Sequence, residues 1–74
     1  MDVKTPTEDG EAEQLRQLIS ARFGVRVRDF MVLVRDGGFA LQGRTYSFHL
    51  KQMVQETVIA ATALRVVANE IAVD

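Results

Sequence analysis

The stretch that decides the fold is residues 25–43, VRVRDFMVLVRDGGFALQG. Its first ten residues are rich in β-branched and aromatic side chains, which favour a strand. Asp36-Gly37-Gly38 then supplies a permissive turn before a second apolar segment, Phe39 to Gly43, and the two segments together predict a β-hairpin. The glycines expected to shape the turn and the returning strand are Gly37, Gly38 and Gly43.

The phase of the first strand predicts two apolar faces. Side chains alternate along a strand, so if Phe30, Val32 and Val34 face one side, Met31 and Leu33 must face the other. One of these faces can pack into the core. The apolar side chains on the other face must be covered by something else.

Helical periodicity flanks the hairpin on both sides. Apolar residues recur at intervals of three and four over residues 12–23, which predicts a first helix. Ser47 is a typical N-cap, and the absence of proline and glycine as far as Thr62 predicts a second helix. Phe48 and Ile59 fall on its exposed side. The residues expected on its core stripe are Leu50, Val54, Thr57, Val58 and Ala61.

Residues 64–73 are β-branched and alternate, so they predict a third strand. Asn69 falls in phase with the inward residues, and its amide is expected to find partners in loop backbone. The order is α-β-β-α-β, an α+β fold. The right-handed crossover rule brings both helices to one face of the three-stranded sheet.

The face of the sheet without helices is expected to be apolar, and apolar strand faces of a small domain are rarely left in water. We therefore expect this face to bind a protein, either a second copy of the chain or another domain. The residues expected at this interface are Met31, Leu33, Ala40, Val66, Ala68 and Ala72 on the sheet, with Ile59 from the second helix.

The glycine turn, the apolar alternation and the second glycine in Gly37–Gly43 resemble the BON domain, a small module of bacterial envelope proteins. Ser47 stands where this family often starts its helix, and residues 67–73 are similar to its closing strand. Ala63 departs from the glycine that the family tends to place before that strand. The resemblance implies a BON-like domain over residues 10–74. It also implies a non-enzymatic module associated with membranes, phospholipids or envelope assemblies.

Composition narrows the function further. The chain has 74 residues, no cysteine, a single histidine and a net charge of −1, which predicts one small soluble domain and excludes disulfides, thiolate zinc sites and histidine-rich metal sites. His49, in the first turn of the second helix, is expected to be a surface residue. No nucleophile with a base and no carboxylate pair has a catalytic spacing, so we expect neither an enzyme nor a cofactor.

Charge is distributed unevenly along the chain. Residues 1–13 carry a net charge of −4, whereas residues 14–73 carry +4 and are mildly basic. Residues 1–9 are expected to form an acidic, partly disordered leader. Guanidinium groups on or beside the hairpin suit phosphate oxygens, so binding to anionic phospholipid is the alternative function. The arginines in question are Arg26 and Arg28, expected on one side of a strand, and Arg35 and Arg44, expected to flank the turn. The same arginines could instead simply face solvent, or form ion pairs with the acidic leader.

Nucleic-acid binding ranks third, because the GxxG clamp of KH-like RNA modules is absent. No apolar run is long enough to cross a bilayer, and the first fifteen residues do not form a secretory signal. We therefore expect a cytoplasmic protein if the chain is complete. A location in the periplasm or cell envelope is expected if it is a piece of a longer protein.

Overall fold

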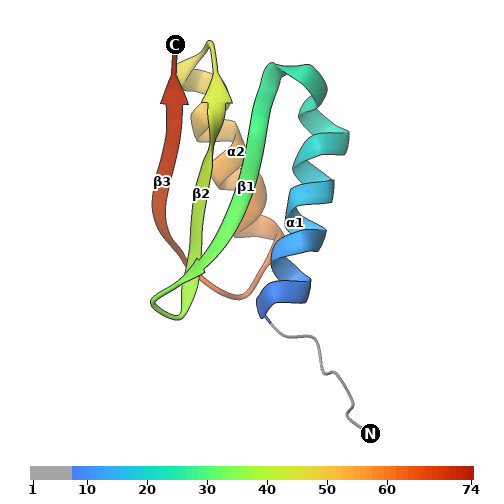
Figure 1. Ribbon diagram of the computed structural model, residues 1–74, viewed down its shortest axis with the longest axis vertical. Helices are drawn as coiled ribbons and strands as arrows, with labels where there is room; N and C mark the ends of the chain where they lie inside the picture. Colours follow the sequence, from blue (N-terminus) through green and yellow to red (C-terminus); the bar gives the residue numbers. More distant parts are fainter. Residues whose placement is uncertain (1–7) are drawn as a thin grey trace, which may run out of the picture.

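The computed structural model describes residues 8–74 (Figure 1). The elements follow the order α-β-β-α-β, with one turn of 3-10 helix inserted after the first helix. They are α1 (Glu8–Phe23), η1 (Gly24–Arg26), β1 (Val27–Arg35), β2 (Gly38–Thr45), α2 (Phe48–Ala61) and β3 (Val66–Val73). Most of the predicted leader lies outside the described residues, and its last two residues belong to α1.

The three strands form one mixed sheet in the order β1-β2-β3. β1 and β2 pair antiparallel through the hairpin, whereas β2 and β3 pair parallel, with α2 in the crossover between them. α1 packs on β1, and α2 packs on β3 and β2. In Figure 1, α2 lies behind the sheet and α1 runs alongside β1, and the element order confirms the predicted α+β fold of two helices packed on a three-stranded sheet.

The core lies between the helices and the inner face of the sheet. α1 contributes Leu15, Ile19 and Phe23 as predicted, and all three are buried. α2 contributes Val54 and Val58, which are fully buried. Phe48 and Ile59 are exposed, which confirms their predicted positions. Ala61 is exposed instead of buried, because it is the last residue of α2.

Two irregularities in the sheet change which residues face the core. The β1–β2 register shifts between Arg28 and Met31, where Asp29 has a φ of 53°, as in a bulge. The β2–β3 register shifts at Phe39, so that Val66 pairs with Phe39 while Ala40 pairs with Ala68. A bulge adds one residue to one strand and reverses the alternation beyond it.

The hairpin turn is formed by Asp36 and Gly37, whose φ values of 52° and 75° are those of a type I′ turn. Gly38 is the first residue of β2 and makes a close approach: a Cβ there would lie 2.5 Å from the Arg65 carbonyl oxygen. Gly43 lies opposite the bulge in β1, against Phe30. The three predicted glycines are therefore structural, but only Gly37 belongs to the turn itself.

Asn69 ties α2 to β3. Its amide nitrogen donates to the Lys51 carbonyl oxygen and to Gln55 Oε1, at 3.3 and 3.0 Å. Its Oδ1 accepts from the Ile71 N–H. The predicted need for polar partners is thus met, but by a helix and the strand itself instead of a loop.

Candidate functional site

The face of the sheet turned away from α1 and α2, here called the outer face, carries the residues that sequence reasoning singled out. Charged and polar side chains alternate on it with apolar ones. Arg28, Met31, Leu33 and Arg35 come from β1. Ala40, Gln42 and Arg44 lie opposite them on β2, and Ala68, Glu70 and Ala72 continue the rows on β3.

One ion pair crosses the outer face from β1 to β3. Arg35 Nη1 donates to Glu70 Oε2 at 2.8 Å, and Gln42 Nε2 donates to Glu70 Oε1 at 3.0 Å. Because β2 lies between the paired strands, this Glu70 bridge passes over β2, where Ala40 is fully buried. Ala40 was predicted to form part of an exposed interface. That prediction is wrong, because the side chains of the sheet itself cover the residue.

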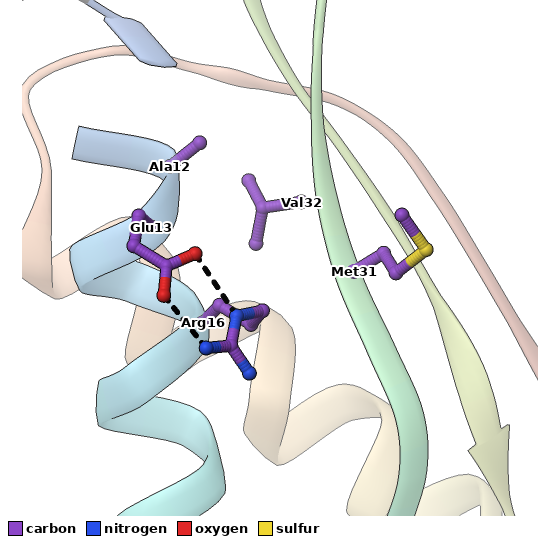
Figure 2. Close-up of a pocket in the computed structure, with 5 residues that line it drawn as sticks. All are labelled: Ala12, Glu13, Arg16, Met31 and Val32. Atoms are coloured by element: carbon purple, nitrogen blue, oxygen red, sulfur yellow. Dashed lines mark hydrogen bonds and ion pairs between the residues drawn. The ribbon is translucent and has the colours of Figure 1, made fainter. Parts of the chain in front are cut away.

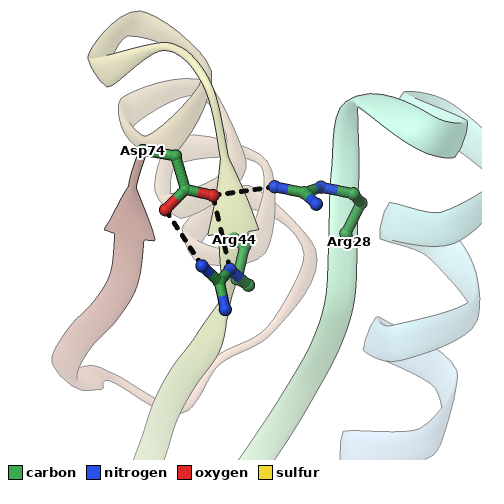
Figure 3. Close-up of polar contacts among 3 residues, drawn as sticks. All are labelled: Arg28, Arg44 and Asp74. Carbon is green, nitrogen blue, oxygen red and sulfur yellow. Dashed lines mark hydrogen bonds and ion pairs between the residues drawn. The ribbon is translucent and has the colours of Figure 1, made fainter.

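A second bridge spans the outer face at the opposite end of the hairpin (Figure 3). The carboxylate of Asp74 accepts from Arg28 Nη2 at 2.8 Å and from Arg44 Nη2 at 3.2 Å. Arg28 also lies over the Tyr46 ring, 4.6 Å from its centroid. This Asp74 bridge depends on the bulge at Asp29, because the bulge puts Arg28 directly opposite Arg44.

These contacts lower the pKa values of both carboxyl groups. Hydrogen bonds from Arg35 and then Gln42 lower the pKa of Glu70 to about 2. The hydrogen bond from Arg44, with a smaller contribution from Arg28, lowers the pKa of Asp74. Both carboxylates are therefore charged at neutral pH, and they compensate most of the positive charge on this face.

The four arginines proposed as an anion site do not form one cluster, because only Arg28 and Arg44 among them lie together. Arg35 is at the hairpin end of β1, whereas Arg28 and Arg44 share Asp74 at the other end. Arg26 lies in η1, where its guanidinium donates to the Phe23 and Arg22 carbonyl oxygens. The expectation that Arg35 and Arg44 both flank the turn is wrong, because Arg44 is seven residues along β2 from that turn.

The predicted apolar interface is also smaller than expected. Val66 packs against the core, because the bulge turns it inward. Ile59 lies on α2, away from the outer face. What remains accessible beside β1 is a group we call the β1 strip. It consists of Met31, which is 51% exposed, and half-buried Leu33 on the outer face, together with Val34, which is 42% exposed near the hairpin on the other face of the strand.

A shallow hollow adjoins the β1 strip between α1 and β1 (Figure 2). It is lined by Ala12, Glu13, Arg16, Met31 and Val32, with a volume of about 200 Å³. Ligand pockets usually measure about 300–1,000 Å³, so the hollow is small for a ligand. Arg16 forms an ion pair with Glu13 at 2.6 Å on its rim. Sequence reasoning missed this feature, because only the tertiary structure brings α1 beside β1.

A second exposed group, here called the end surface, lies where α1 meets β1 and β2 meets α2. Val25 is 88% exposed in η1, and the rings of Tyr46 and Phe48 are exposed in the other connection. Arg26 lies over the Phe23 ring, and Lys51 lies over that of Phe48. Val25 was expected in a strand, but the chain is still helical at this point.

Over residues 8–74, no group of three or more metal-ligating side chains is present. Neither α1 nor α2 is long and apolar enough to span a membrane. Comparisons with known protein families, curated proteins and solved structures found no match to this chain. A function must therefore be argued from the surfaces described above.

Proposed function

We propose that the chain is a non-enzymatic, BON-like interaction module that binds another protein through the β1 strip. The simplest partner is a second copy of the chain. The observation that carries the proposal is the exposure of Met31 beside half-buried Leu33, between two bridges that compensate the surrounding charge. An apolar centre with a polar rim is the usual anatomy of a protein interface.

The energetics support a small interface. Full burial of a large apolar side chain contributes about 1.5–3 kcal/mol, and Met31, Leu33 and Val34 are each partly accessible before association. In a dimer, these three side chains would be buried on both copies. Association in the micromolar range is therefore reasonable, because ordering and lost rotational freedom offset part of the gain.

Sedimentation equilibrium of the isolated chain tests the proposal. We expect reversible association at high micromolar concentration that Met31→Asp abolishes. Ile59→Asp is the matched control, because Ile59 is also 51% exposed but lies on α2. A wild-type chain that stays monomeric, or equal losses in both variants, would contradict the proposal.

The end surface favours a second candidate, attachment to anionic phospholipid. Exposed rings and an exposed valine beside cations suit a headgroup region, where apolar parts insert and cations meet phosphate. In this candidate Arg26 and Lys51 are the principal cations, Arg28 and Arg44 are shared with Asp74, and Arg35 has no role.

Liposome flotation separates this candidate from simple apolar adsorption. Vesicles containing phosphatidylglycerol should capture the chain, neutral vesicles should not, and Arg26→Gln with Lys51→Gln should reduce capture. Arg65→Gln is the control, because Arg65 lies before β3, at the other end of the sheet. Equal capture by both vesicle types would exclude electrostatic attachment.

A further inference from the structure

The free edge of β1 carries backbone groups that the sheet does not use. In a two-residue hairpin the flanking residues, here Arg35 and Gly38, exchange both hydrogen bonds, and such pairs alternate with non-bonded ones. Leu33 and Ala40 are therefore bonded to each other. The N–H and C=O groups of Val32 and Val34 point away from β2, toward the free edge.

α1 runs alongside this edge, but β1 leans away from α1 toward the hairpin (Figure 1), and a hollow at Met31 and Val32 lies between the two elements. The edge is therefore least covered near the hairpin, where Val34 is 42% exposed. Residues 31–34 include no proline and no charged side chain, the usual devices that keep edge strands apart.

The opposite edge of the sheet is better protected. The Asp74 N–H donates to the Thr45 carbonyl oxygen on β2, so by alternation the Ile71 N–H points to the free edge of β3. Asn69 Oδ1 accepts from that N–H. One donor at the centre of the β3 edge is thereby occupied within the chain, which favours β1 for strand addition.

We propose that the free edge of β1 pairs antiparallel with the same edge of a second copy, with a two-fold axis at Leu33. The inference rests on the proposed self-association and gives it a geometry. Val32 lies opposite Val34 of the second copy, so their free N–H and C=O groups form hydrogen-bonded pairs. Leu33 lies opposite its own counterpart, and the two sheets become one continuous sheet.

The sequence of this edge suits a second copy. Val32-Leu33-Val34 reads the same in both directions, so a symmetric antiparallel pair puts valine against valine on the inner face and leucine against leucine on the outer face. The nearest charged side chain on the strand, Arg35, is compensated by Glu70. No like charges therefore oppose each other across the three central positions.

Two variants with matched exposure test the geometry. Val34→Lys places a charge at the proposed seam, and Val73→Lys places the same charge at the β3 edge; the two valines are 42% and 41% exposed. By sedimentation equilibrium, we expect Val34→Lys to weaken dimerisation about tenfold or more, whereas Val73→Lys leaves it within about twofold.

Amide hydrogen exchange by NMR supplies the decisive readout. The Val32 and Val34 amides should exchange slowly in concentrated samples and quickly in dilute ones, while the Val73 amide exchanges quickly in both. If the chain dimerises and Met31→Asp abolishes the dimer, but the Val32 and Val34 amides stay fast, association through the outer face stands and edge pairing is wrong. If the chain does not dimerise at all, the proposed self-association fails first.

Discussion

Gly38 shows how a single residue sets the spacing of the sheet. A Cβ at this position would lie 2.5 Å from the Arg65 carbonyl oxygen and 2.8 Å from Val67 Cγ1. The same carbonyl oxygen accepts the Phe39 N–H at 2.9 Å, which joins the start of β2 to the segment before β3. The absence of a side chain at Gly38 therefore allows the parallel pair to close.

We expect Gly38→Ala to lower the free energy of unfolding by about 1–3 kcal/mol, because the backbone of Arg65 must move to admit a methyl group. Urea denaturation measures the loss. Gly37→Asn is the control: the Gly37 site is spatially open, and asparagine tolerates its positive φ. A Gly38→Ala variant as stable as the wild type would contradict the close approach.

Asn69 joins α2 to β3 through three hydrogen bonds. Asn69→Ala should destabilise the fold by about 1–3 kcal/mol, because the partly buried Lys51 carbonyl and Gln55 amide lose a partner. It should also increase aggregation, since the Ile71 N–H at the β3 edge becomes free. Urea denaturation and light scattering provide the two measurements. Gln52→Ala, at an exposed amide of α2, should change neither.

At the scale of elements, α2 has a well-defined start. Ser47 is extended, with φ −136° and ψ 130°, and its Oγ accepts from the Leu50 N–H at 3.2 Å. A hydroxyl at this position satisfies one of the N–H groups that lack a partner in the first turn. The same turn brings Phe48 to the end surface, so the cap also positions a candidate lipid contact.

Ser47→Ala should therefore reduce stability by about 1 kcal/mol, as the loss of an N-cap does elsewhere. Thermal and urea unfolding measure the change. Ser20→Ala makes the same substitution at an exposed position within α1 and should have little effect. Equal effects in the two variants would show that the hydroxyl of Ser47 does not act as a cap.

At the scale of the whole molecule, the two bridges hold the outer face together across all three strands. The Glu70 bridge joins β1 to β3 over Ala40, and the Asp74 bridge joins Arg28 and Arg44 to the chain beyond β3. Both are exposed, so salt screens them and each pair contributes little on its own. The stability that they contribute should nevertheless decrease as the pH falls, because folding lowers the pKa values of both carboxyl groups.

The pKa of Glu70 is lowered from 4.5 to about 2 in the folded chain, chiefly by Arg35. The folded state therefore gains stability from this carboxylate above its unfolded pKa and loses it as pH falls from about 4.5 toward about 2. We expect the thermal midpoint of the wild type to fall more steeply over this range than that of Glu70→Gln. The difference should shrink in high salt.

Glu56→Gln, on the exposed side of α2, is the control for this prediction, because it removes a carboxylate that the bridges do not use. Its acid profile should follow the wild type. If Glu70→Gln and the wild type have parallel profiles at low salt, the Glu70 bridge does not form in solution.

The sequence by itself determined the order of elements, the core stripe of the first helix, the buried Val54 and Val58 of the second, and the exposed positions of Phe48 and Ile59. Periodicity of 3.6 or 2 residues is a local property, and burial of an apolar stripe follows from it directly. The hairpin could also be predicted from the sequence, because Asp36-Gly37 supplies the two positive φ values that its turn requires.

Only the tertiary structure decided what lies on the outer face. Bulges at Asp29 and beside Val66 each reverse the alternation, which moves Arg28 outward and Val66 inward. The partners of the bridges, such as Arg35 and Glu70, are 35 residues apart and meet only because three strands lie side by side. Strand register depends on packing across the sheet, so a local pattern cannot specify it.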